Sequence, residues 1–99
     1  MITPTVGRVV WFYKDGKPHT EQPYAAIVTY VHSDTMINVV AFDYNGVSFG
    51  ETSVLLIQDE GSYGNPGGGS WACWMPYQKG QAAKTEQLLA AQQLPSNKI

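Results

Sequence analysis

The chain has little of what several large classes of protein require. It contains a single cysteine, Cys73, so it cannot form an internal disulfide, and its start, MITPTVGRVV, lacks the basic and apolar regions of a secretory signal peptide. Its apolar runs are far shorter than the ~20 residues of a membrane-spanning helix. We therefore expect an intracellular protein with no membrane partner.

Charge is also scarce. Only 14% of the 99 residues are charged, and the net charge is −2. The basic residues are scattered along the chain instead of clustered, at Arg8, Lys14, Lys17, Lys79, Lys84 and Lys98. Proteins that bind duplex nucleic acid concentrate such residues to neutralise phosphates, so no duplex partner is expected.

What the chain does have is a run of strand-forming residues between positions 24 and 49. Its β-branched and aromatic residues are interrupted by Ser33-Asp34-Thr35 and by Asn45-Gly46. Asn-Gly between two apolar runs is a strong signal for a tight hairpin. The pattern predicts strands over residues 24–32, 36–43 and 47–52 that form an antiparallel meander.

Further elements are predicted before and after this meander. Residues 7–13 predict a first strand, and the charged loop 14–23 joins it to the second, as a plain connector or as a clamp on a ligand. The quartet 54–57 continues the fourth strand past a bend or forms a fifth strand. Residues 71–77 predict the last strand, ended by Pro76, and the Ala/Gln/Leu-rich residues 79–94 predict a helix ended by Pro95.

These elements predict a mainly β protein, a small antiparallel barrel of five or six strands with one C-terminal α-helix. Ninety-nine residues suffice for one domain, with the barrel in residues 1–78 and the helix and tail in residues 79–99. The second and third strands are apolar on both faces, and the helix is only weakly amphipathic. An apolar outer face that one weak helix cannot cover predicts a homo-oligomer.

The glycine-rich loop 61–69, followed by Trp71 and Trp74, is the feature most similar to a binding site. Indole faces stack on bases, and a glycine backbone approaches a phosphate closely. The loop opens a strand and lacks Gly-Lys-Ser/Thr, so a P-loop is excluded. The candidate ligand-binding residues are Arg8, Trp11, Tyr13, Tyr24, Trp71 and Trp74. In the alternative interpretation the loop is disordered, the tryptophans are core, and Arg8 makes an ordinary ion pair.

No pattern of residues indicates catalysis. His19, His32 and Cys73 lack metal-ligand spacing, so neither a metal nor a cofactor is expected. Cys73, between two tryptophans, is expected to pack as a small buried hydrophobe rather than to act as a thiolate. The carboxylates stand at turns and strand ends, where they commonly cap loops. We therefore expect a binding protein and not an enzyme.

Several segments carry a resemblance to a known family. They are Pro4-Thr5-Val6-Gly7-Arg8-Val9-Val10, Tyr24-Ala25-Ala26-Ile27-Val28-Thr29, Ile37-Asn38-Val39 with Phe42, and residues 71–76 after the glycine loop. Through these the chain resembles small phage and prophage proteins with an SH3-like β-barrel, over about three quarters of its length. The family usually carries Trp-His-Trp-Pro where this chain has Trp71-Ala72-Cys73-Trp74-Met75-Pro76, so no role for a motif histidine applies here.

The resemblance implies a phage protein that acts in the host cytoplasm, and most members of the family have no assigned activity. Two functions follow as hypotheses. In the first, the protein sequesters a small nucleotide-like immune signal and so inhibits anti-phage defence, by analogy with other small phage proteins. In the second, it is a structural or assembly protein that acts through protein–protein contacts.

Overall fold

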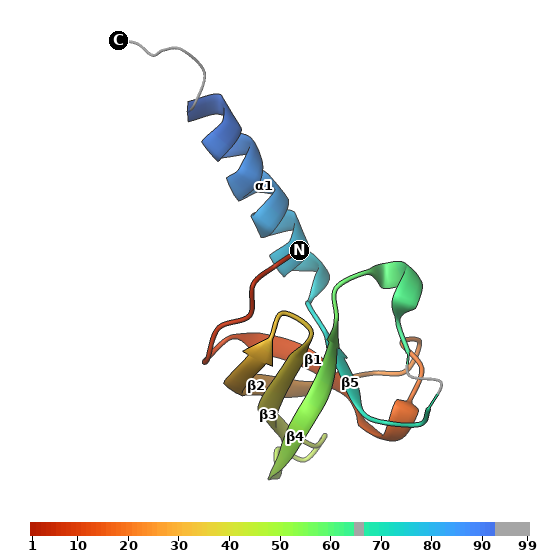
Figure 1. Cartoon of the computed structure of the whole chain (residues 1–99). Coiled ribbons are helices and arrows are strands. Elements are labelled where there is room, and N and C mark those ends of the chain that lie inside the picture. The colour runs from red at the N-terminus through yellow and green to blue at the C-terminus, as the bar shows by residue number, and fades with distance from the viewer. Residues whose placement is uncertain (65–66, 93–99) are drawn as a thin grey trace.

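The computed structural model describes residues 1–64 and 67–92, which form a small β-barrel with one long helix (Figure 1). The strands are β1 (Val9–Tyr13), β2 (Tyr24–Ser33), β3 (Met36–Phe42), β4 (Ser48–Ile57) and β5 (Trp71–Cys73). Two single-turn 3-10 helices, η1 (Lys14–Gly16) and η2 (Glu60–Ser62), lie in the loops, and α1 (Pro76–Gln92) follows β5. The predicted mainly β barrel with a C-terminal helix is confirmed. No helix in the described part of the chain is long and apolar enough to cross a membrane.

The two predicted hairpin turns join β2 to β3 and β3 to β4. Gly46 takes the left-handed conformation, with φ of 82°, that the Asn-Gly signal anticipates. The carboxylate of Asp43 accepts hydrogen bonds from the backbone N–H groups of Asn45 and Val47, each at 2.9 Å. This side chain therefore caps its own turn, as expected for a carboxylate at a strand end.

The barrel closes in the order β1-β2-β3-β4-β5, with β5 also paired to β1. All pairs are antiparallel except β4 with β5, which run parallel, with Leu55 opposite Trp71 and Ile57 opposite Cys73. The prediction of a wholly antiparallel barrel is therefore wrong at this pair. A tight hairpin forces antiparallel pairing, whereas the long connection over residues 58–70 carries the chain back to the level of Leu55, in the last part of β4, before β5 begins.

Strand β4 is continuous through a bend at Ser53, which settles the two alternatives left open for residues 54–57. Ser53 has a positive φ of 53°, and its N–H donates to the Oδ1 atom of Asn38 at 2.8 Å. On the facing strand the register shifts between Ile37 and Val39. The side chain of Asn38 thus satisfies the backbone group that the bend removes from the ladder.

Strand β5 is shorter than expected and α1 begins earlier, at Pro76 instead of Lys79. A proline is favoured in the first helical turn, because it has no N–H to lose and its φ is already helical. The side chain of Gln78 reinforces this start, since its Oε1 atom accepts from the N–H of Met75 at 2.9 Å. The predicted end of the helix at Pro95 lies outside the described residues.

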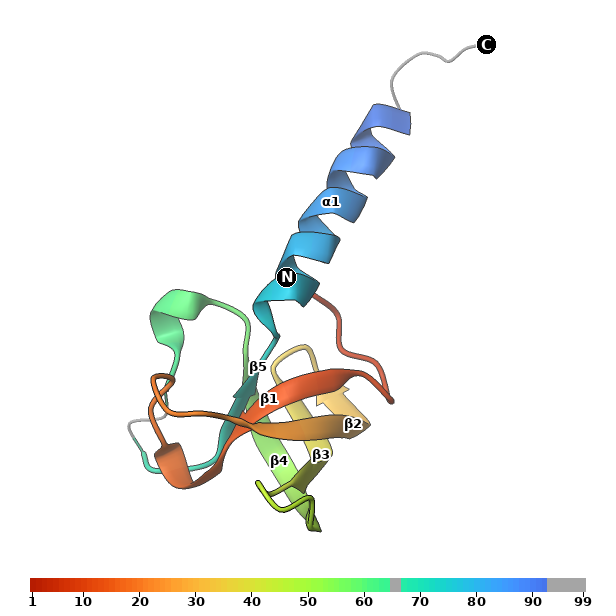
Figure 2. The same ribbon diagram turned by 180° about the vertical axis from the view of Figure 1, so that it is seen from behind.

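The core fills the barrel with inward side chains from every strand, including Val10, Phe12, Val28, Ile37, Val39, Val54, Leu56 and Trp74. The outer face of the sheet is apolar too, because Val9, Ile27 and Val40 face one another across β1, β2 and β3. Val9 remains 39% exposed. Helix α1 does not cover this face, because it leaves the barrel after β5 and points away from it (Figures 1 and 2).

Candidate functional site

The six residues expected to bind a ligand do not form one site. Arg8 and Trp74 lie together at the end of the barrel from which α1 leaves. Trp11, Tyr13 and Trp71 belong to a second cluster on the outer side of β1 and β5. Tyr24 packs against Phe49 and Tyr44, and it lines a pocket together with Tyr13. The structure therefore spreads over neighbouring environments the residues that the sequence predicted in one site.

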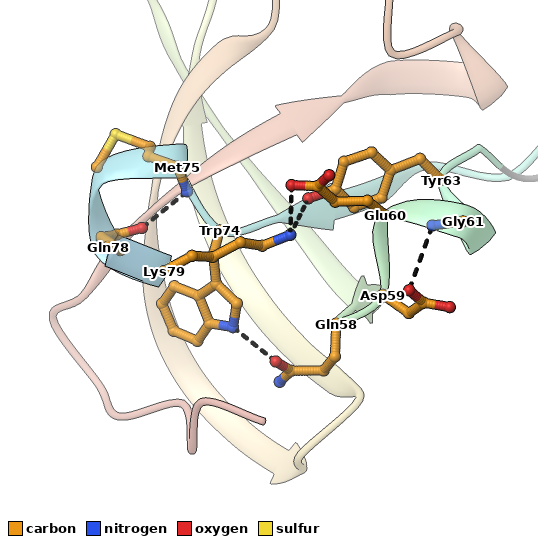
Figure 3. A network of polar contacts seen from close by, with 9 residues as sticks. All are labelled: Gln58, Asp59, Glu60, Gly61, Tyr63, Trp74, Met75, Gln78 and Lys79. Atoms are coloured by element: carbon orange, nitrogen blue, oxygen red, sulfur yellow. Dashed lines mark hydrogen bonds and ion pairs between the residues drawn. The ribbon is translucent and has the colours of Figure 1, made fainter. Parts of the chain in front are cut away.

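Trp74 closes the barrel core beneath Arg8. Its indole is 1% exposed, and the Cζ atom of Arg8 lies 5.1 Å from the centre of the ring. The indole Nε1 donates to the Oε1 atom of Gln58 at 3.0 Å (Figure 3). A cation on its face, core side chains around it and a satisfied N–H leave this ring without a free face on which a base could stack.

Trp71 is the centre of the outer cluster. It is fully buried, and it stacks on Tyr13 with ring centres 4.2 Å apart and planes only 9° from parallel. Its Nε1 donates to the carbonyl of Lys17 at 2.9 Å, and Tyr63 packs beside it with ring centres 5.5 Å apart. The burial of Trp71 and Trp74 supports the structural alternative for both, and a ligand role for them stays a prediction.

The described part of the glycine-rich loop packs on η1. The hydroxyl of Ser70 accepts from the N–H of Asp15 at 3.1 Å. A Cβ atom on Gly16, where φ is 74°, would lie 2.9 Å from the Cα atom of Gly68. Position 16 therefore requires glycine for two reasons: its backbone conformation is left-handed, and Gly68 leaves no room for a side chain. These contacts hold the end of the glycine-rich loop, which leads into β5, against η1, which follows β1.

A pocket that the sequence did not assign lies beside Tyr13 and Tyr24. We name it the Tyr–Lys pocket; its lining is Phe12, Tyr13, Lys14, Lys17, Gln22, Tyr24 and Tyr44. Only about 10 Å³ of it is open, because the ring of Tyr44 lies edge-on to Tyr24 with centres 4.7 Å apart. Tyr44 is nevertheless 64% exposed, and its hydroxyl donates to the carbonyl of Gln22.

The chemistry of the Tyr–Lys pocket suits an anion attached to an aromatic group. Its lining contains two lysines and three tyrosine hydroxyls, but no carboxylate. Lys14 also lies over Phe49, with Nζ 5.1 Å from the ring centre. Lys14, Lys17 and Gln22 all come from the loop 14–23, and whether that loop clamps a ligand or only connects two strands stays a prediction.

The hydroxyl of Tyr13 remains protonated over a wide pH range. Burial, with smaller effects from Cys73 and Tyr63, raises the pKa of Tyr13 from 10.0 to about 12. Since the folded state holds this proton more tightly than the unfolded state, the stabilisation is complete below pH 10 and is lost as the pH rises from 10 to 12.

We therefore expect the free energy of unfolding to fall by about 3 kcal/mol more in the wild type than in Tyr13→Phe between these pH values. Urea unfolding of both proteins from pH 9 to pH 12 measures the difference. Equal pH dependence of the two proteins would show that Tyr13 is not responsible.

A polar network under α1 joins the helix to the loop that carries η2 (Figure 3). The Nζ atom of Lys79 lies 2.6 Å from the hydroxyl of Tyr63 and 3.3 Å from Oε1 of Glu60. Burial raises the pKa of Tyr63 and of the Cys73 thiol. Cys73 is fully buried, as expected. This network fixes the first turn of α1. Burial keeps the thiol neutral, although Tyr63 and Lys79 of the network act in the opposite direction on the pKa of Cys73.

A second cavity lies beneath the arch of η2 on the outer side of β4. We name it the loop cleft; it measures about 400 Å³ and is lined by Thr35, Leu55, Leu56, Ile57, Gln58, Asp59, Ser62 and Gly64. Ser62 and Gly64 belong to the glycine-rich loop, whereas none of the six predicted site residues contributes to the lining. Among the described residues that line it, Asp59 is the only charged one, and its Oδ1 atom accepts from the N–H of Gly61 at 3.3 Å (Figure 3).

Comparisons with known proteins give no relative of this chain. A scan against models of protein families finds no match, and searches of curated proteins and of solved structures find none either. The resemblance to phage barrel proteins therefore stays a prediction. Any function of the chain has to be inferred from its own residues and geometry.

Proposed function

We propose that this protein is a non-catalytic binding protein that sequesters a small, anionic, nucleotide-like molecule in the Tyr–Lys pocket. The observation that carries the proposal is the lining of this pocket, where Lys14 and Lys17 occur together with three tyrosines and, among the described residues that line it, no carboxylate. Lysines bind phosphate as point charges, and tyrosine rings offer stacking faces. Two residues expected from the sequence, Tyr13 and Tyr24, belong to this pocket.

Binding requires the pocket to open. Ligand pockets measure roughly 300–1,000 Å³, far more than the space now free beside Tyr44. Tyr44 is suited to act as the gate because it stands in an exposed turn and is held by one hydrogen bond to Gln22 and one ring contact with Tyr24. Lys17 is already exposed, and rotation of the Tyr44 side chain toward solvent would open the pocket beside the half-buried Lys14 and Tyr24.

The test is a panel of cyclic nucleotides, cyclic dinucleotides and ADP-ribose derivatives in a thermal-shift assay. A molecule present at one hundred times its dissociation constant should add about 2.7 kcal/mol to the free energy of unfolding. Replacement of Lys14 or Lys17 by glutamine should weaken its binding about tenfold, because each loses one charge-assisted hydrogen bond.

The matched control is Lys84→Gln, which removes the same charge from α1, far from the pocket along the chain. Its affinity should equal that of the wild type. Stabilisation by a nucleotide that is indifferent to Lys14 and Lys17 would place the ligand elsewhere, and a panel without any stabilising molecule would reject the sequestering function.

The second hypothesis, a structural or assembly protein acting through protein–protein contacts, is favoured by a different observation. Helix α1 is 17 residues long, and the polar contacts that the described residues give it with the barrel come from its first turn, at Gln78 and Lys79. Most of the stability of a helix in a protein comes from the packing of its side chains, so packing against another chain would stabilise α1. The uncovered apolar face of β1, β2 and β3 is a second reason to expect protein–protein contacts, and it favours a homo-oligomer.

Both functions accord with an SH3-like barrel protein of phage origin that acts in the host cytoplasm, and we include these attributes in the proposal. They rest on the sequence segments that resemble the phage family. The five-stranded closed barrel is compatible with that resemblance.

A further inference from the structure

We propose that the loop cleft is the docking site for helix α1 of a second copy of this chain, with Leu88 of that copy in the cleft and its Lys84 next to Asp59. The proposal rests on the self-association described above and is independent of the Tyr–Lys pocket. The docking would bring together two features of the chain. The first is the apolar loop cleft with its one carboxylate, and the second is helix α1 with an uncovered face that carries an apolar and a cationic side chain.

The uncovered face of α1 is defined by its spacing. Tyr77, Gln81, Lys84 and Leu88 follow one another at intervals of four, three and four residues, which places them on one side of a helix. All four are exposed, and Tyr77 and Leu88 are 66% and 62% exposed. Lys79, Ala82 and Ala83 line a cavity with Met1 and Ile2, so the N-terminal arm lies on the other side of the helix.

The loop cleft has the complementary chemistry. Leu55, Leu56 and Ile57 supply an apolar lining, and Asp59 supplies a negative charge at its rim. The volume of about 400 Å³ exceeds what one leucine side chain fills, so the cleft can also receive part of the helix backbone. Among the described residues Lys84 has no ion-pair or hydrogen-bond partner, and Asp59 has no cationic one.

A chain cannot fill its own cleft with Leu88. The base of α1 is fixed to η2 through Lys79 and Glu60, and Glu60 adjoins Asp59. A helix rises about 1.5 Å per residue, so Leu88 lies about 18 Å along the axis from Pro76. Because α1 points away from the barrel (Figures 1 and 2), only the helix of another copy brings Leu88 to this cleft.

The first experiment measures self-association by light scattering and sedimentation over a range of concentrations. The wild type should form an oligomer. Leu88→Gln and Leu55→Gln should each raise the dissociation constant at least tenfold, whereas Val47→Gln, at an apolar residue that is 61% exposed elsewhere on the barrel, should leave it unchanged.

The second experiment exchanges the charges. Lys84→Asp and Asp59→Lys should each weaken association by fivefold or more, and the two together should restore it to within about twofold of the wild type. Since Asp59 also caps η2, Asp59→Asn, which retains the cap, is the folding control and should lose only part of the affinity.

The third experiment detects the contact directly. A mixture of Leu88→Cys and Leu55→Cys proteins should form a mixed disulfide under mild oxidation, and a mixture of Leu88→Cys and Val47→Cys should not. A wild type that has the mass of one chain at every concentration would overturn both the self-association and this docking. An oligomer that is unaffected by the cleft and helix variants would overturn the docking alone.

Discussion

Replacement of Trp71 by alanine is expected to lower the free energy of unfolding by about 3–5 kcal/mol. The side chain is fully buried, and its removal would leave a cavity between Tyr13 and Tyr63. It would also remove the hydrogen bond to the carbonyl of Lys17, which holds the loop 14–23 against β5. Loss of a large aromatic side chain from a packed cluster is among the most destabilising single changes.

Urea unfolding monitored by far-UV circular dichroism measures this loss. Trp71→Phe should cost about 1–2 kcal/mol, because it keeps a ring against Tyr13 but loses the indole N–H donor. The matched control is Tyr30→Ala, at an aromatic side chain that is 56% exposed on β2, where we expect a change within about 0.5 kcal/mol. A loss below about 1 kcal/mol for Trp71→Ala would show that the outer cluster does not stabilise the fold.

Replacement of Gln58 by alanine is expected to destabilise the protein by about 2–4 kcal/mol, a large effect for a half-buried polar residue. Its amide nitrogen donates to the carbonyls of Ile2 at 2.8 Å and Asp34 at 2.9 Å. Its amide oxygen accepts from the N–H of Ile2 at 3.2 Å and from Nε1 of Trp74 at 3.0 Å. One side chain thus joins the N-terminal arm, the turn before β3 and the barrel core.

The loss should be unevenly distributed among the four bonds. Trp74 is the buried donor, so leaving its N–H unsatisfied should account for most of the effect. Gln58→Glu, which keeps the acceptor for Trp74 but not the donors for Ile2 and Asp34, should therefore be milder at pH 7 than Gln58→Ala. Gln81→Ala is the matched control on the exposed face of α1, with no expected change. Equal stability of Gln58→Ala and the wild type would contradict the role assigned to this amide.

Local sequence patterns predicted the strands and their turns for a physical reason. Strand periodicity and the Asn45-Gly46 signal act over a few residues, so they specify β2, β3 and β4 without knowledge of the rest of the chain. Pro76 was harder to interpret, because a proline ends a strand and starts a helix equally well. The parallel pairing of β5 with β4 was not predictable, since it depends on the path of the long connection between them.

The candidate site was less accessible from the sequence. Aromatic residues close in the chain were expected to share a pocket, yet Trp71 in β5 and Trp74 just after it lie in different clusters, one outside the barrel and one within it. Alternation along a strand separates neighbours in this way. Lys14 and Tyr44 line the Tyr–Lys pocket together with Tyr24. They come from two turns that are distant in the sequence, and no sequence motif links these turns.

The sequence by itself determined the class of the fold, the meander of β2 to β4 and the presence of one helix near the C-terminal end, because these depend on short-range propensity and periodicity. Only the tertiary structure decided which aromatic rings are buried, which lysines line a pocket together with tyrosines, and that α1 leaves the barrel with one face uncovered. Those properties depend on barrel closure, in which β5 pairs with both β1 and β4, and closure is fixed by packing among residues far apart in the chain.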